Sequence, residues 1–225
     1  MVSTAYFDTT ISSQNGDIVT LDTSAAVKSL TVGGGSLFSD LTDNGYAQSL
    51  TIGYGLHVAT TGEVWLTGGT VVTAGADSSN QGSMLLSNGS SLSVSGNFTN
   101  SFILETEGAG SMLNVTQLFT NTATEQLRID AGGSASLGGL DNAGSVYVGA
   151  GSALTLNGCV ISDVPHGSQY TVYGTFNLGG QSAFRNLSSI EGSVNLNGQF
   201  VNIEPIYNIT RVRGNFRDES ASDVD

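Results

Sequence analysis

The chain contains very little charge, proline and cysteine for its 225 residues. Charged residues make up 11% of the sequence, well below the roughly 25% of an average soluble protein. Cys159 is the single cysteine, which excludes an intramolecular disulfide. No apolar run is long enough for a transmembrane helix, and residues 1–6 do not read as a signal peptide. The chain is nevertheless long enough to bury a sizeable apolar core without a metal or a disulfide.

Basic residues are especially scarce. Six Lys and Arg stand against nineteen Asp and Glu, which gives a formal net charge of −13. Proteins that bind nucleic acid neutralise phosphates with clustered Lys and Arg. The composition therefore disfavours nucleic acid as a partner.

A short motif recurs at a constant interval. Its copies are Phe98-Thr99-Asn100, Phe119-Thr120-Asn121, Leu140-Asp141-Asn142 and Ile161-Ser162-Asp163, each 21 residues after the last. Asn80 precedes Asn100 by 20 residues. Such a period indicates a repeat architecture in which each unit packs on the next.

Between these motifs, apolar and polar residues alternate, which is the period of a strand with one buried face. Gly, Asn and Ser turns separate the strands, and helical spacing is absent. We therefore predict an all-β solenoid of about 20–21 residues per coil, because a single coil can bury its inward face only against the next one.

Stacked coils place equivalent side chains in columns. One predicted inward column contains Phe98, Phe119, Leu140 and Ile161, and a second group contains Val64, Leu66, Met84, Leu86, Val146 and Val148. Stacked amides at a turn predict an asparagine ladder, because each amide can both donate and accept along the column. Its members are Asn80, Asn100, Asn121, Asn142 and Asp163.

The spacing also predicts three parts of the chain. Residues 1–27 form an amino-terminal cap or edge, and residues 28–202 form the coils, with a loop near 162–173. Residues 203–225 form a carboxy-terminal edge and an acidic tail, which is frayed or is the cut edge of a larger protein.

An exposed apolar stripe is the main candidate for a binding site. In the repeated Gly-X-apolar-X-apolar pattern, the middle residue lies between two inward residues and should project outward. The predicted stripe consists of Trp65, Leu85, Ile103 and, beyond Arg128, Tyr147. Exposed apolar stripes mark contact surfaces, either for a partner or for another part of the same protein.

Two acidic groups could carry chemistry. Glu105 and Glu107 lie two residues apart, at a separation that suits an inverting glycosidase, but they also suit an exposed strand on which Arg128 pairs with one of them. Asp40 and Asp43 offer oxygen ligands for calcium, although no known calcium-loop pattern surrounds them, which favours an Asx turn. We expect no catalytic residue and no cofactor, with calcium as the alternative.

Histidine and cysteine residues are too few and too dispersed to indicate a further site. His57 lies between Leu56 and Val58 and should point outward. His166 is far from it in sequence, and Cys159 has no partner at metal-ligand spacing. We expect Cys159 to be a small packed side chain and not a nucleophile.

The Phe-Thr-Asn repeats and the stretch Gly-Ser-Val-Tyr-Val-Gly-Ala-Gly-Ser-Ala-Leu-Thr-Leu at 144–156 resemble the repeats of large secreted bacterial β-helical proteins. The resemblance is to autotransporter passengers and adhesins and covers residues 17–202. It implies a right-handed parallel β-helix that is exported and displayed at a cell surface. No catalytic motif, translocator barrel or Arg-Gly-Asp tripeptide accompanies it.

We therefore expect a non-enzymatic extracellular module for structure or adhesion, whose faces and loops meet carbohydrate or protein partners. A polysaccharide lyase or hydrolase on the same fold is one alternative, although scattered basic residues disfavour acidic sugars. A self-assembling filament joined through coil ends is another. An ice-binding solenoid would need outward Thr-X-Thr ranks, which the predicted column lacks.

Overall fold

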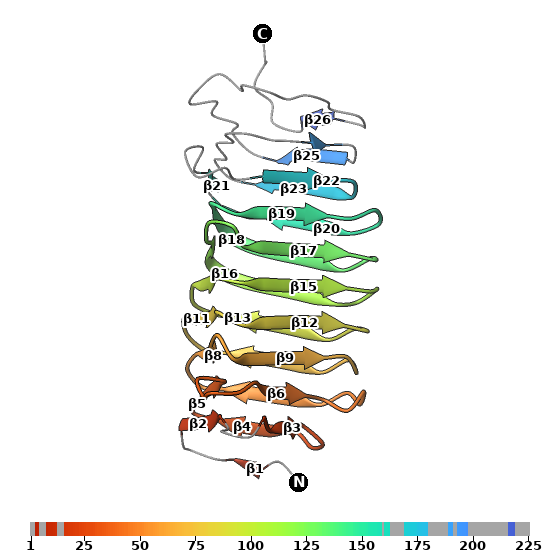
Figure 1. Ribbon diagram of the computed structural model, residues 1–225. Coiled ribbons are helices and arrows are strands. Elements are labelled where there is room, and N and C mark those ends of the chain that lie inside the picture. Colours follow the sequence, from red (N-terminus) through yellow and green to blue (C-terminus); the bar gives the residue numbers. More distant parts are fainter. Residues whose placement is uncertain are drawn as a thin grey trace.

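The chain forms a column of stacked coils built from parallel strands (Figure 1). The computed structural model describes residues 3–4, 8–12, 16–158, 160–162, 169–179, 189–190, 193–197 and 216–218. This part of the chain contains no helix, and thus none that could cross a membrane. The prediction of an all-β solenoid is confirmed, whereas its right-handed sense stays a prediction.

A nine-stranded sheet forms one side of the column. Its strands follow one another coil by coil, and each one pairs in parallel with its neighbours. They are β3 (Ile18–Thr20), β6 (Ser39–Thr42), β9 (Gly62–Leu66), β12 (Ser83–Ser87), β15 (Ile103–Glu107), β17 (Gln126–Asp130), β19 (Ser145–Val148), β22 (Gln169–Val172) and β24 (Ser189–Ile190).

A seventeen-stranded sheet forms the other two sides. The first series of stacked strands is β1 (Ser3–Thr4), β4 (Ala25–Val27), β7 (Ser49–Ile52), β10 (Val71–Ala74), β13 (Ser91–Val94), β16 (Met112–Asn121), β18 (Ser134–Asn142), β20 (Ala153–Leu156), β23 (Thr175–Gly179), β25 (Ser193–Asn197) and β26 (Phe216–Asp218). The second series is β2 (Asp8–Ile11), β5 (Ser29–Val32), β8 (Leu56–Val58), β11 (Ser78–Asn80), β14 (Phe98–Asn100), the ends of β16 and β18, and β21 (Val160–Ser162). The two series belong to one sheet because β16 and β18 run through both.

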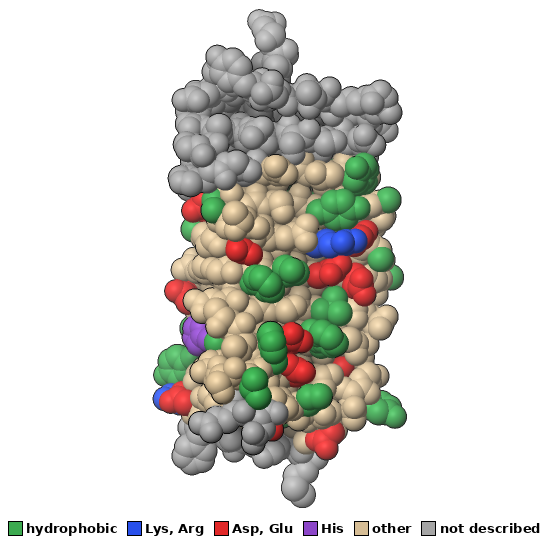
Figure 2. All heavy atoms as spheres, viewed as in Figure 1, with side chains coloured by type: hydrophobic (Ala, Val, Ile, Leu, Met, Phe, Trp, Pro, Cys, Tyr) green, Lys and Arg blue, Asp and Glu red, His purple; other side chains and the backbone are tan. Residues whose placement is uncertain are grey.

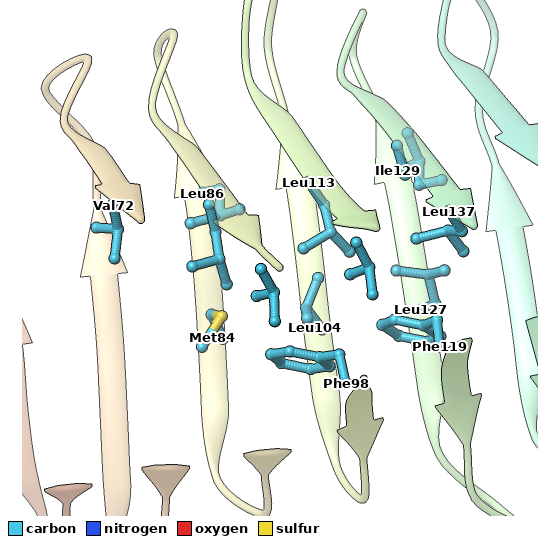
Figure 3. Close-up of a cluster of buried hydrophobic side chains, with 14 of the residues drawn as sticks. Val72, Met84, Leu86, Phe98, Leu104, Leu113, Phe119, Leu127, Ile129 and Leu137 are labelled. Atoms are coloured by element: carbon cyan, nitrogen blue, oxygen red, sulfur yellow. The ribbon is translucent and has the colours of Figure 1, made fainter. Parts of the chain in front are cut away.

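The core lies inside the column, and from β5 to β20 it is built from the alternate, inward residues of the strands (Figure 3). Phe98, Phe119 and Leu140 are completely buried and stand opposite one another in successive coils. The rings of Phe98 and Phe119 stack with centroids 5.5 Å apart. This inward column is therefore confirmed over three coils. The second predicted group is at most 1% exposed and is also confirmed: Val64, Leu66, Met84, Leu86, Val146 and Val148.

The prediction that Ile161 continues the phenylalanine column is wrong. Val160 stands opposite Leu140, and Ile161 stands opposite Asp141. This coil takes 20 residues from Leu140 to Val160, one fewer than each of the two coils before it. The predicted loop near 162–173 overlaps β22, and residues 163–168 lie outside the described residues.

The asparagines form a continuous hydrogen-bonded ladder at one corner of the column. The Nδ2 atoms of Asn80, Asn100 and Asn121 each donate to the Oδ1 atom of the next asparagine at 2.9 Å, and the ladder ends at Asn142. All four side chains are completely buried. Ser162 is the residue opposite Asn142, and Asp163 lies outside the described residues.

Candidate functional site

The outward side of the nine-stranded sheet carries two long columns of side chains. The first column, read along the coils, contains Asp40, Glu63, Ser83, Ile103, Gln126, Ser145 and Gln169. The second contains Thr42, Trp65, Leu85, Glu105, Arg128, Tyr147 and Thr171. Hydrophobic and acidic side chains lie close to one another on this side of the molecule, among uncharged polar ones (Figure 2).

The structure brings together part of the predicted apolar stripe. Trp65 is 49% exposed and stands opposite Leu85 in the second column. Ile103 is 39% exposed on the same side, but it stands opposite Ser83 in the first column, which corrects the predicted position. Glu105 takes the place opposite Leu85, so the stripe is interrupted by charge.

Arg128 is the centre of a polar cluster higher in the second column. Its Nε lies 3.0 Å from Oε1 of Glu105, and its Nη2 donates to Oδ2 of Asp130 at 2.6 Å. The guanidinium also lies over the ring of Tyr147, 5.2 Å from the centroid. The expected ion pair with a glutamate is thus present with Glu105, and Asp130 takes the place that Glu107 could have filled.

The Arg128 cluster changes the acidity of its carboxyl groups in opposite directions. The hydrogen bond from Arg128 lowers the pKa of Asp130, aided by the backbone N–H of Ala131. Burial raises the pKa of Glu105, with contributions from Glu107 and Asp130, and outweighs the effect of Arg128. The general acid of a glycosidase needs a raised pKa. The carboxylate of Glu105, however, is paired with Arg128 and not directed at an open site.

Asp40 and Asp43 point to different places. Asp43 is completely buried, and its carboxylate accepts hydrogen bonds from the backbone N–H groups of Gly45, Thr67 and Gly68 at 2.9 to 3.1 Å. Asp40 lies on the outward side opposite Glu63. Within the described ranges, no group of three or more His, Cys, Asp or Glu side chains could hold a metal ion. Asp43 therefore has the structural role that an Asx turn gives it.

We expect Asp43→Asn to lower the free energy of unfolding at neutral pH by about 1 kcal/mol, because charged acceptors form stronger hydrogen bonds than neutral ones. Burial alone raises the pKa of Asp43, but the N–H donors of Thr67 and Gly68 outweigh it and the pKa is lowered. The stabilisation is therefore full above the ordinary aspartate pKa and is lost as pH falls through the lowered value. Urea denaturation at a series of pH values should show the two proteins converging in acid. A difference that stays constant into acid would contradict this role.

A buried hydroxyl column at a second corner escaped sequence reasoning. The Oγ of Ser90 accepts from the N–H groups of Gly69 and Thr70, and the Oγ atoms of Ser111 and Ser152 accept from Gly89 and Gly132 of the preceding turns. The signal was a Ser or Thr that follows each glycine turn at nearly the coil period. These hydrogen bonds connect the turns of successive coils beside the nine-stranded sheet.

His57 is exposed, as predicted, and its Nδ1 lies 3.1 Å from Oγ of Ser79 in the next coil. Cys159 and His166 lie outside the described residues.

Comparisons of the chain with known protein families, with curated proteins and with solved structures find no match. The β-solenoid that the repeats predicted is present, and a link to autotransporter passengers stays a prediction.

Proposed function

We propose that this chain is a non-enzymatic, surface-displayed module for structure or adhesion, which presents the outward side of its nine-stranded sheet to a glycan or protein partner. The observation that carries the proposal is the half-exposed ring of Trp65, which stands beside Leu85 on a regular strand surface. Aromatic side chains of this kind are frequent anchors of binding interfaces.

The rigid core beneath the ring supports this role. Val64 and Leu66, the neighbours of Trp65 in β9, are each 1% exposed and packed into the core. The backbone of β9 is held on both sides, by β6 and by β12. A partner would therefore meet a preorganised surface and would lose little entropy in ordering it.

Replacing Trp65 with alanine is expected to leave the circular dichroism spectrum and the melting midpoint nearly unchanged, because half of the ring is outside the core. Attachment to the partner should weaken by at least about 1 kcal/mol, as is usual for the loss of an aromatic anchor. Glycan-array binding, protein capture and sedimentation of the wild type and the variant measure this effect.

Tyr46→Ala is the matched control, because Tyr46 is 70% exposed but lies in the turn after β6, away from the sheet surface. It should bind like the wild type. Unaltered binding by folded Trp65→Ala protein would refute the contact surface, and a collapsed fold would place the ring in the core.

A further inference from the structure

The outward side of the nine-stranded sheet already holds one guanidinium group. Glu105 and Asp130 flank Arg128, and the ring of Tyr147 lies under its guanidinium. Two carboxylates and one aromatic ring thus form a complete receptor for an arginine side chain. The contact between Arg128 and Asp130 shows that side chains two residues apart on this surface reach one another.

The same set of groups recurs three coils earlier in Asp40, Glu63 and Trp65. Asp40 and Glu63 stand opposite each other in β6 and β9, and Trp65 follows Glu63 by two residues on the same side. Within the described part of the chain, neither carboxylate forms an ion pair. Lys28, the other basic side chain whose contacts are described, pairs with Asp8 and lies over Tyr54.

The electrostatics of the two carboxylates indicate that they are suited to a cation. Burial raises the pKa of Glu63, and the nearby charge of Asp40 raises it further. A cation between the two groups would relieve this repulsion.

We propose that Asp40, Glu63 and Trp65 bind an arginine side chain of a partner protein. The inference rests on the proposed function, because it uses the same contact surface, and it adds the chemistry of the partner. Arginine fits better than lysine, since its planar guanidinium can stack on the indole ring and bridge two carboxylates at once. The net charge of −13 also attracts a basic segment.

Trp65 is the single tryptophan of the chain, so its fluorescence reports on this site alone. The probe is the peptide acetyl-Gly-Arg-Gly-amide, and the matched control replaces arginine with citrulline, which has the same shape and no charge. The arginine peptide should produce a saturable change in emission that the citrulline peptide does not. A lysine peptide should bind more weakly than the arginine peptide.

Glu63→Gln should weaken binding of the arginine peptide by about three- to fivefold, which is the size expected for a partly exposed ion pair. Asp141→Asn removes the same charge from another side of the column and should leave the affinity within about 1.5-fold, the limit expected of a screened charge. Melting curves of both variants verify the fold. Equal losses in the two variants, no saturable change, or equal affinity for arginine and lysine peptides would each overturn the arginine site.

The outcome is separable from that of the proposed function. If Trp65→Ala weakens attachment while the arginine peptide does not bind, the contact surface stands and the arginine site is wrong. If Glu63→Gln weakens peptide binding while Trp65→Ala attaches normally, the arginine site stands and the attachment role is wrong.

Discussion

Replacing Phe119 with alanine is expected to lower the free energy of unfolding by about 3–5 kcal/mol, because removal of the buried ring leaves a cavity that the surrounding side chains cannot fill. Phe119 is completely buried, stacks on Phe98 and stands opposite Leu140 in the next coil. The cavity would lie between three coils whose backbones are fixed by strand pairing. Urea denaturation followed by circular dichroism measures the loss.

Thr120→Ala is the matched control, since Thr120 is the next residue of β16 and points to the outward side. Its effect should stay within about 0.5 kcal/mol. Comparable losses in the two variants would show that the inward and outward sides of β16 have been exchanged.

The asparagine ladder should give the second large effect. Asn121→Ala is expected to cost about 1–3 kcal/mol, the range for leaving buried polar groups without partners. Asn121 accepts from Asn100 and donates to Asn142, and its amide also donates to the backbone oxygens of Glu125 and Ser145 at 3.2 and 3.1 Å. The substitution removes the amide that donates to Oδ1 of the buried Asn142 and so interrupts the ladder.

Asn114→Ala provides the comparison, because Asn114 lies in the same strand on the outward side and is only partly buried. Thermal and urea melts of the two variants should differ clearly. An unchanged midpoint for Asn121→Ala would mean that the ladder contributes nothing to stability.

The alternation of apolar and polar residues and the repeat of 20–21 residues were sufficient to predict the coils and most of the core. The first follows directly from the two faces of a strand, and the second from the length of a coil. They could not assign every column. Ile103 and Glu105 differ by two positions and therefore point to the same side, so alternation cannot decide which of them stands opposite Leu85. The register could have been taken from the ladder, since Ser83 and Ile103 each follow a ladder asparagine by three residues.

Coil lengths that change by one residue were the second limit. The shorter coil before Val160 moved Ile161 by one place, and a one-residue change exchanges the two sides of a strand. The ion pairs of the candidate site could not be assigned from spacing for a different reason.

Arg128 can reach carboxylates on the neighbouring strand and also on its own strand. The spacing of the residues therefore could not show that its second partner is Asp130, two residues along the same strand, and not Glu107.

The amides of the ladder all donate in one direction, from Asn80 toward Asn142. The ladder therefore has a direction, because each of these amides donates to the asparagine that follows it in the chain. A further coil of the same kind could be inserted at any level of the ladder, because each level offers the same acceptor below and the same donor above. Tandem duplication of one coil would thus lengthen the rod without a new interface. A coil inserted in the opposite sense would instead set donor against donor on one side and acceptor against acceptor on the other, so the ladder can be extended only by coils that run in the same direction.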